Sequence, residues 1–236
     1  MAWETPGAEL NAQGSVNEVL AQESAGAFMA KVYRWMVAGL AVTAVTAVYT
    51  ASNEAVLQVV VPNLMPIIIG KFILVMVMSW LAPRLSAPLA GGLFLLYSFT
   101  TGLVFSVLFL VYQLGSIGQA FAVTGGAFAA LSAYGTFTKK DLSAWRTFLF
   151  MGLIGVVIAG VVQIFVQSSM LEFVWSCACV VVFAGLTAYD TQKLRTLHAS
   201  SGYSSAGTFA VSGALTLYLD FVNLFLAILR LMGRRR

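Results

Sequence analysis

Two aspartates interrupt apolar stretches in the C-terminal part of the chain. Asp190 lies in "GLTAYDTQKL", directly after a long apolar run, and Asp220 lies in the middle of "GALTLYLDFVNLFLAILRLMG". A charged side chain at the centre of a bilayer costs about 2.5–3.5 kcal/mol on translocon-derived scales, so such a residue normally faces other protein groups. Two carboxylates that meet in a low-dielectric site tend to share one proton. The pair is therefore a candidate pH sensor, and in the ionised state it offers oxygen ligands to Ca²⁺.

The residues around Asp220 predict a polar face on a helix. This face consists of polar or small residues spaced by three or four positions, namely Ser212, Thr216, Asp220, Asn223, Ala227 and Arg230. Positions at that spacing share one side of an α-helix. We expect this side to point into a helix bundle, with Ser212, Thr216 and Asn223 supporting the acid.

Each acid also has a simpler interpretation. Asp190 alone is compatible with a juxtamembrane position in the first polar turn after a helix. Asp220 alone is compatible with a buried structural acid that is hydrogen-bonded to hydroxyls or paired with Lys71, the intramembrane cation in "IIIGKFILV". Lys71 could instead extend toward an interface. The positive charge of Lys71 argues more directly than any other feature against a simple calcium leak.

The composition is that of a membrane protein. Of the 236 residues, 60% are hydrophobic and only 9% are charged, whereas soluble domains carry about 25% charged residues. Several apolar runs have the length of about 20 residues that crosses a bilayer as an α-helix. We therefore predict an all-α, polytopic membrane protein. The net charge of +4 is interpreted as a topology signal and not as a surface for nucleic acid.

Seven membrane segments are predicted in one domain. They lie at roughly 32–51, 64–82, 88–112, 117–137, 147–167, 171–191 and 207–229. Residues 1–27 contain glutamates but no lysine or arginine, and we expect them to form a polar, acidic N-terminal tail in the cytoplasm. Residues 28–236 are expected to form the membrane domain.

The positive charges indicate the orientation. Eight lysines and arginines lie at the ends of the segments that face the tail, namely Lys31, Arg34, Arg84, Lys139, Lys140, Arg146, Lys193 and Arg195. The opposite loops, at about 52–63, 113–116 and 168–170, contain none. Because cytoplasmic loops are enriched in these residues, the tail side is predicted to be cytoplasmic. The arginines after the seventh segment break this pattern, because a full crossing places them outside. A full crossing is nevertheless favoured over a re-entrant insertion, since the segment is long enough to span and comes last, where the charge rule is weakest; the sequence does not settle the choice.

The sequence contains few residues that are candidates for catalysis. The only histidine, His198, lies in a polar stretch, and Cys177 and Cys179 lie in an apolar run, where they are interpreted as packing residues. No nucleophile–base pair, phosphate-binding glycine loop or metal cluster is visible. We therefore expect a protein that is not an enzyme and that has no cofactor beyond transiently bound Ca²⁺.

Three motifs resemble the Bax inhibitor-1 family, and specifically its bacterial YccA/YbhL-like branch. They are "GLTAYDTQKL", "GALTLYLDFVNLFLAILRLMG" and "TKKDLSAW", and "LFLLYSFTTGLVFS" is similar to a further stretch of the family. The resemblance covers about residues 28–233. It implies a seven-helix bundle in which the last helix is central, and a pH-sensitive calcium leak gated by Asp190 and Asp220.

The resemblance also bears on the two basic residues of the candidate site. Relatives use an arginine near the end of the second helix as a latch to the acid pair, and Arg84 in "LAPRLS" is the nearest match. Lys71 departs from the family pattern, which places ion conduction in question more than the fold.

Two functions therefore remain as hypotheses from the sequence. The first is a calcium leak channel of the bacterial inner membrane, gated by the aspartate pair. The second is a regulatory membrane protein that binds other membrane proteins, such as a quality-control protease or the secretion machinery, through its acidic tail. A proton-coupled transporter is less favoured, because no internal repeat with broken helices is evident.

Overall fold

The computed structural model describes residues 6–81, 85–200 and 206–236, and it describes the side chains of 25–81, 85–196 and 207–236. The described residues form helices connected by short loops, and the helices are α1 (Pro6–Ser52), α2 (Glu54–Val60), α3 (Leu64–Leu81), α4 (Ala87–Phe105), α5 (Leu108–Val111), α6 (Leu114–Phe137), η2 (Leu142–Trp145), α7 (Arg146–Val166), α8 (Ser169–Ser200) and α9 (Ala206–Met232). The predicted all-α class is confirmed. Within the described residues, seven helical segments are long and apolar enough to cross a membrane, as the sequence predicted.

The structure adds detail to the prediction at three places, namely the third segment, the loop at 52–63 and the boundary of the tail. The third is interrupted after α4, where the Ser106 hydroxyl donates a hydrogen bond to the Leu103 carbonyl at 2.7 Å. Such a local bond competes with the helical pattern, and α5 follows as a separate short helix. The loop predicted at 52–63 contains α2, whose first turn is capped by the side chain of Asn53. The predicted boundary between the tail and the membrane domain falls inside α1, which is continuous from Pro6 to Ser52.

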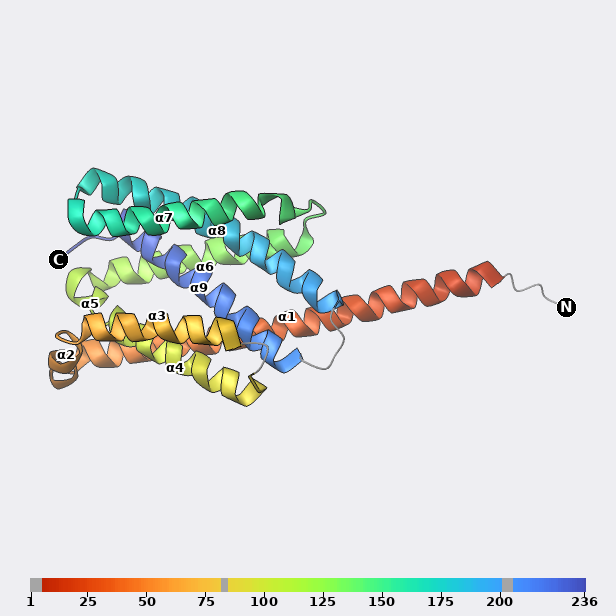
Figure 1. Ribbon diagram of the computed structural model, residues 1–236, viewed down its shortest axis with the longest axis horizontal. Helices are drawn as coiled ribbons and strands as arrows, with labels where there is room; N and C mark the ends of the chain where they lie inside the picture. The colour runs from red at the N-terminus through yellow and green to blue at the C-terminus, as the bar shows by residue number, and fades with distance from the viewer. Residues whose placement is uncertain (1–5, 82–84, 201–205) are drawn as a thin grey trace.

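The last helix is the central one. In its apolar window 56% of the residues are buried, against at most 33% in any other candidate span of the described chain. Figure 1 shows α9 passing diagonally between the group that contains α1, α3 and α4 and the group that contains α6, α7 and α8. Helices α3 and α7 lie outside, where α3 packs on α4 and α7 packs on α8. Nearly every face of α9 is therefore covered by protein.

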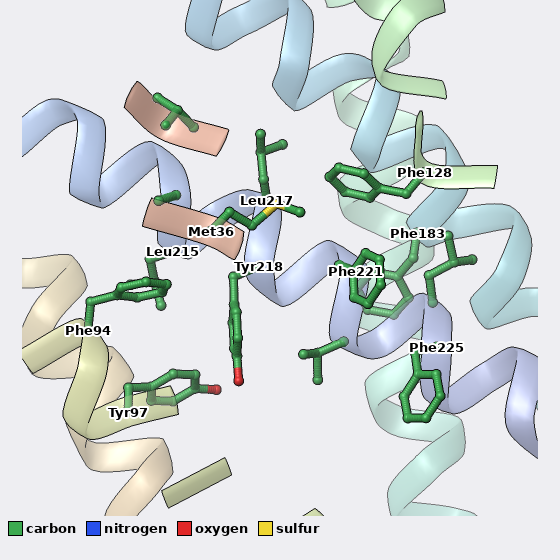
Figure 2. Close-up of a cluster of buried hydrophobic side chains, with 14 of the residues drawn as sticks. Met36, Phe94, Tyr97, Phe128, Phe183, Leu215, Leu217, Tyr218, Phe221 and Phe225 are labelled. Atoms are coloured by element: carbon green, nitrogen blue, oxygen red, sulfur yellow. The ribbon is translucent and has the colours of Figure 1, made fainter. Parts of the chain in front are cut away.

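Aromatic side chains surround α9 and form the centre of the core. Figure 2 shows Tyr218 beside Phe94 and Tyr97 of α4, and Phe221 beside Phe128 of α6. The ring centroids are 5.5 Å apart both in the pair Phe94–Tyr218 and in the pair Phe128–Phe221, and the ring planes are inclined at 87° and 66° in an edge-to-face arrangement. Edge-to-face pairs at this separation are favourable beyond the area that they bury. These contacts hold α9 against α4 on one side and α6 on the other.

The C-terminal arginines lie at the end of the bundle opposite to the start of α1 (Figure 1). The backbone N–H of Gln113 donates to the Arg234 carbonyl at 3.1 Å, and the N–H of Arg236 donates to the Val111 carbonyl at 2.9 Å. Gln113 follows α5, at the end that the charge rule predicts to be outside the cytoplasm. Helix α9 therefore runs the full length of the bundle, which agrees with a full crossing and not with a re-entrant insertion.

Candidate functional site

Asp220 lies in the interior of the bundle, midway along α9. Its side chain is only 5% exposed, and its Oδ2 atom is buried without a hydrogen-bond partner among the described residues. A buried carboxylate oxygen without a partner loses its hydration and gains nothing in return, which is costly for the ionised form. Asp220 is therefore poised to hold a proton or to accept a new partner.

Asp190 approaches Asp220 from the neighbouring helix. Figure 1 shows α8 and α9 side by side and antiparallel, and their contact is the most extensive between any two helices of the described chain. Asp190 is half-buried on α8 and lies close enough for its charge to act on Asp220. Lys193, one turn further along α8, acts in turn on Asp190. The structure thus brings the two predicted acids within electrostatic range of each other.

A close crossing of α6 and α8 holds Asp190 in place. A side chain on Gly135 would collide with the carbonyl oxygen of Ala188, so only glycine allows the two backbones to approach this closely. On the same crossing, the Thr191 hydroxyl lies 3.4 Å from that of Ser132. No signal in the sequence distinguishes Gly135, Ser132 or Thr191, because a small residue in an apolar helix does not indicate which helix it contacts.

The predicted supporting face of α9 is present, but its donors point elsewhere. Ser212, Thr216 and Asn223 are half-buried. The Thr216 hydroxyl donates to the carbonyl of Ser212 at 3.2 Å, and the Asn223 amide donates to the carbonyl of Leu219 at 2.8 Å. Both donors are therefore used within their own helix. The Asp220 carboxyl does not receive these hydrogen bonds.

Of the two basic residues predicted as partners of the acids, Lys71 is described by the structure and Arg84 is not. The Lys71 ammonium lies over the rings of Tyr97 and Phe105, 5.2 Å and 5.9 Å from their centroids. Lys71 forms no ion pair with Asp220, since the ion pair present in the described chain joins Arg235 and Glu172. Arg84 lies outside the described residues, so its predicted latch role stays a prediction.

A second buried polar cluster lies on the opposite side of α9. The Tyr218 hydroxyl is 2.6 Å from Thr43 Oγ1, and Thr43 Oγ1 is also 2.9 Å from the Ser98 carbonyl. Because Tyr218 and Asp220 are two positions apart on one helix, they project in nearly opposite directions. The cluster therefore joins α1, α4 and α9, while Asp220 faces α8. These residues could not be predicted from the sequence, because isolated hydroxyls are common in membrane helices.

The available ligands limit what the site can do with a metal ion. The described residues contain no group of three or more histidine, cysteine, aspartate or glutamate side chains that could hold a metal. The acid pair supplies two carboxylates, whereas Ca²⁺ takes six to eight oxygen ligands. The arrangement suits brief contact with a cation that keeps part of its water shell.

Comparisons with known proteins agree with the sequence motifs. A family model described as "Inhibitor of apoptosis-promoting Bax1" matches residues 25–236. The inner membrane protein YbhL of Escherichia coli K12 is 45% identical over 215 residues, which cover 89% of this chain and 92% of YbhL. An uncharacterized protein of Deinococcus radiodurans is 46% identical over 210 residues, 88% of this chain and 90% of its own. One of Borreliella burgdorferi is 40% identical over 214 residues, 89% of this chain and 92% of its own.

Proposed function

Because the chain belongs to the Bax inhibitor-1 family, we propose that it is a pH-sensitive calcium leak channel gated by Asp190 and Asp220. The observation that carries the proposal is the buried, unpartnered Oδ2 atom of Asp220 within electrostatic range of a second acid on an adjacent helix. The name of YbhL and the apolar helices support a location in the bacterial inner membrane. The distribution of lysine and arginine supports a cytoplasmic N-terminus.

The gate follows from the electrostatics of two carboxyls in a medium of low dielectric constant. With one proton on the pair, the protonated carboxyl can donate to the ionised one and hold α8 against α9. With no proton, two negative charges repel each other across this helix contact, and separation or cation binding relieves the repulsion. The proton and the cation therefore compete for the same oxygens. The protonated pair corresponds to the closed state.

The position of Lys71 is compatible with a cation path at the acid pair. Its ammonium is engaged by the rings of Tyr97 and Phe105 on α4, whereas Asp220 faces α8. A cation over aromatic faces is stabilised by the ring quadrupoles without a carboxylate partner. The positive charge of Lys71 is thus held by α4 and leaves the two carboxylates free to attract Ca²⁺.

Calcium flux into proteoliposomes tests this function directly. Purified protein is reconstituted with a calcium-sensitive dye inside the vesicles, and initial rates are measured at mildly acidic and mildly alkaline pH. Wild type should conduct faster at alkaline pH, whereas Asp220→Asn should give one rate at both pH values. Asp141→Asn is the matched control, because Asp141 is exposed at the N-terminus of η2 and belongs to no acid pair. A pH response that persists in Asp220→Asn contradicts the gate.

One observation favours the second candidate, a regulator that binds other membrane proteins. Helix α1 continues well beyond the rest of the bundle toward its N-terminus (Figure 1), and this extension carries Glu9, Glu18 and Glu23. A projecting helix with acidic residues can dock on a basic partner surface. Replacing the three glutamates by glutamine and measuring co-purification with a reconstituted quality-control protease tests this role. The calcium flux should survive these substitutions, so the two functions are separable.

A further inference from the structure

A basic cavity opens at the end of the bundle that the charge rule predicts to be cytoplasmic. Its volume is about 660 Å³. It lies between the C-terminal end of α6, the loop and η2 that lead into α7, and the C-terminal part of α8. Five cationic side chains line it, namely Lys139, Lys140, Arg146, Lys193 and Arg195, together with one acid, Asp141. The positive-inside rule accounts for cations on this side of the membrane. It does not require them to converge on one cavity.

The positive charge of this cavity is not neutralised from within. Asp141 is exposed, and its carboxylate accepts a hydrogen bond from the Ser143 N–H at 2.9 Å, so it serves as the cap of η2. None of the five cations forms an ion pair with a described carboxylate within 4.0 Å, since the ion pair of the described chain joins Arg235 and Glu172 at the opposite end. Lys193 acts on Asp190, and Arg195 donates to the Thr136 carbonyl. The cavity therefore retains a large excess of positive charge.

The walls of the cavity are held by hydrogen bonds between elements distant in sequence. Gln192 on α8 accepts from the N–H of Leu142 at 2.8 Å and donates to the carbonyl of Lys140 at 2.9 Å. The N–H of Lys140 donates to the hydroxyl of Thr138 at 3.2 Å. These bonds fix the backbone that carries Lys139 and Lys140 against α8. The cations are thus presented on a fixed frame, with both lysine side chains free of these structural bonds.

The cavity lies beside a surface that faces lipid. Trp145 is 58% exposed and Phe148 is 63% exposed, and their rings meet edge to face with centroids 6.2 Å apart. Exposed tryptophan at the end of an apolar helix is typical of the level of the lipid headgroups. Arg146 lies between these aromatic residues, at the start of α7, whose outer face is exposed and apolar. A lipid whose anionic headgroup occupies the cavity can therefore place its acyl chains along the outer face of α7.

We propose that this cavity binds the phosphate-bearing headgroup of an anionic phospholipid. Lysine and arginine clusters at the cytoplasmic ends of membrane helices attract such headgroups through charge and through hydrogen bonds to phosphate oxygens. A free phosphate ester shares this chemistry, but the adjacent lipid-facing surface of α7 favours the lipid. The cavity adjoins the gate, since Tyr189 and Lys193 line it and Asp190 lies between them in sequence. The inference still does not depend on calcium conduction, because it concerns binding by the basic side chains and not a pathway for cations.

Native mass spectrometry of the full-length, delipidated protein tests the proposal. Phosphatidylglycerol and phosphatidylcholine with identical acyl chains are titrated in separate samples, and bound lipids are counted. We expect phosphatidylglycerol to bind with clear preference. The double variant Lys139→Gln/Lys140→Gln should lose on the order of tenfold to thirtyfold in affinity, because each cation near an anionic surface contributes about 1 kcal/mol.

The control variant carries the same charge loss on the same side of the membrane. Lys31→Gln/Arg34→Gln removes two exposed cations of α1 that lie outside the cavity, and it should bind phosphatidylglycerol like wild type. An equal loss in both double variants overturns the proposal, because it indicates general attraction to the positive face. If the thermal stability of the first double variant is reduced, the single variants Lys139→Gln and Arg146→Gln take its place.

A soluble anion is the remaining alternative, and it is tested in the same assay. Glycerol phosphate without acyl chains is added in excess before the lipid. If it prevents phosphatidylglycerol binding at concentrations similar to those of the lipid, the occupant is a soluble phosphate ester and the lipid proposal is wrong. If phosphatidylglycerol displaces it readily, the acyl chains contribute to binding as proposed. Neither readout involves ion flux, so failure here is distinct from failure of the proposed channel function.

Discussion

The hydroxyl of Tyr218 lies 2.6 Å from Oγ1 of Thr43, although the two residues are 175 positions apart in the chain. Tyr218 is fully buried, and its ring is packed edge to face against Phe94 and Tyr97. This hydrogen-bond contact is one of the interactions that join the last membrane helix to the first. It lies on the side of α9 that does not carry the acid pair, so it separates the scaffold role of α9 from its proposed gating role.

Removing the Tyr218 hydroxyl tests that separation. Tyr218→Phe keeps the ring and deletes one buried hydrogen bond, so we expect a loss of about 1 kcal/mol of stability with no change in the pH response of calcium flux. Tyr49→Phe is the control, because the side chain of Tyr49 is 62% exposed. Thermal unfolding in detergent measures the first effect. A lost pH response in Tyr218→Phe would show that the two sides of α9 act together.

The buried carboxyl of Asp220 predicts a stability effect that depends on pH. Asp220→Asn removes a charge that has no partner at Oδ2, so the variant should unfold at a higher temperature than wild type at alkaline pH. At acidic pH the wild-type carboxyl is protonated, and the difference should shrink. The expected gain is about 1–3 kcal/mol, the typical cost of an unsatisfied buried polar group. Equal melting temperatures at alkaline pH would mean that the ionised Asp220 has an unrecognised partner.

The close contact between α6 and α8 predicts that a glycine-to-alanine substitution on α6 lowers the stability at Gly135 but not at Gly126. In Gly135→Ala the added carbon would meet the carbonyl of Ala188, two residues before Asp190, and overpacking of this kind costs about 1–3 kcal/mol. Gly126→Ala on the same helix is the matched control, since nothing lies within 4 Å of its new carbon. Thermal unfolding should separate the two variants. If Gly135→Ala is as stable as Gly126→Ala, the close crossing is wrong.

The full crossing of α9 predicts which ends of the chain share a side of the membrane. Single cysteines are introduced by Arg236→Cys, Glu54→Cys and Lys139→Cys in a background with Cys177→Ala and Cys179→Ala. A membrane-impermeant maleimide added to right-side-out vesicles should label Arg236→Cys and Glu54→Cys and leave Lys139→Cys unlabelled. Labelling of Arg236→Cys together with Lys139→Cys, after the vesicles are inverted, would instead indicate a re-entrant last helix.

The sequence was sufficient to predict the membrane helices and the two acids, because both signals are local. An apolar run of membrane length identifies a helix without reference to its neighbours. The same holds for Asp190 and Asp220, since a carboxylate inside such a run is conspicuous. That the last helix would be central came from the family resemblance, and the burial of α9 agrees with it.

Features that depend on contacts between distant segments could not be predicted. One hydrogen-bond partner of Thr43, Tyr218, is on the last helix. Gly135, which allows the close approach of Ala188, is one of 21 glycines in the chain. The ring contacts of Lys71 likewise require the packing of α3 on α4. Residue type alone gives no means to choose among many such partners, so these positions became visible only when the helices were placed together.

The central position of α9 has a consequence for the biosynthesis of the protein. Its 27 residues contribute to the core contacts of four other helices, yet among the described membrane segments they are synthesised last. Until then the preceding helices have no partner for the rings of Phe94 and Phe128 that pack on α9, or for the face of α8 that carries Asp190. Domains generally complete folding only when their core elements are present. The helices before α9 therefore cannot complete the core until α9 has been inserted. A protein truncated before α9 is expected to lack this core.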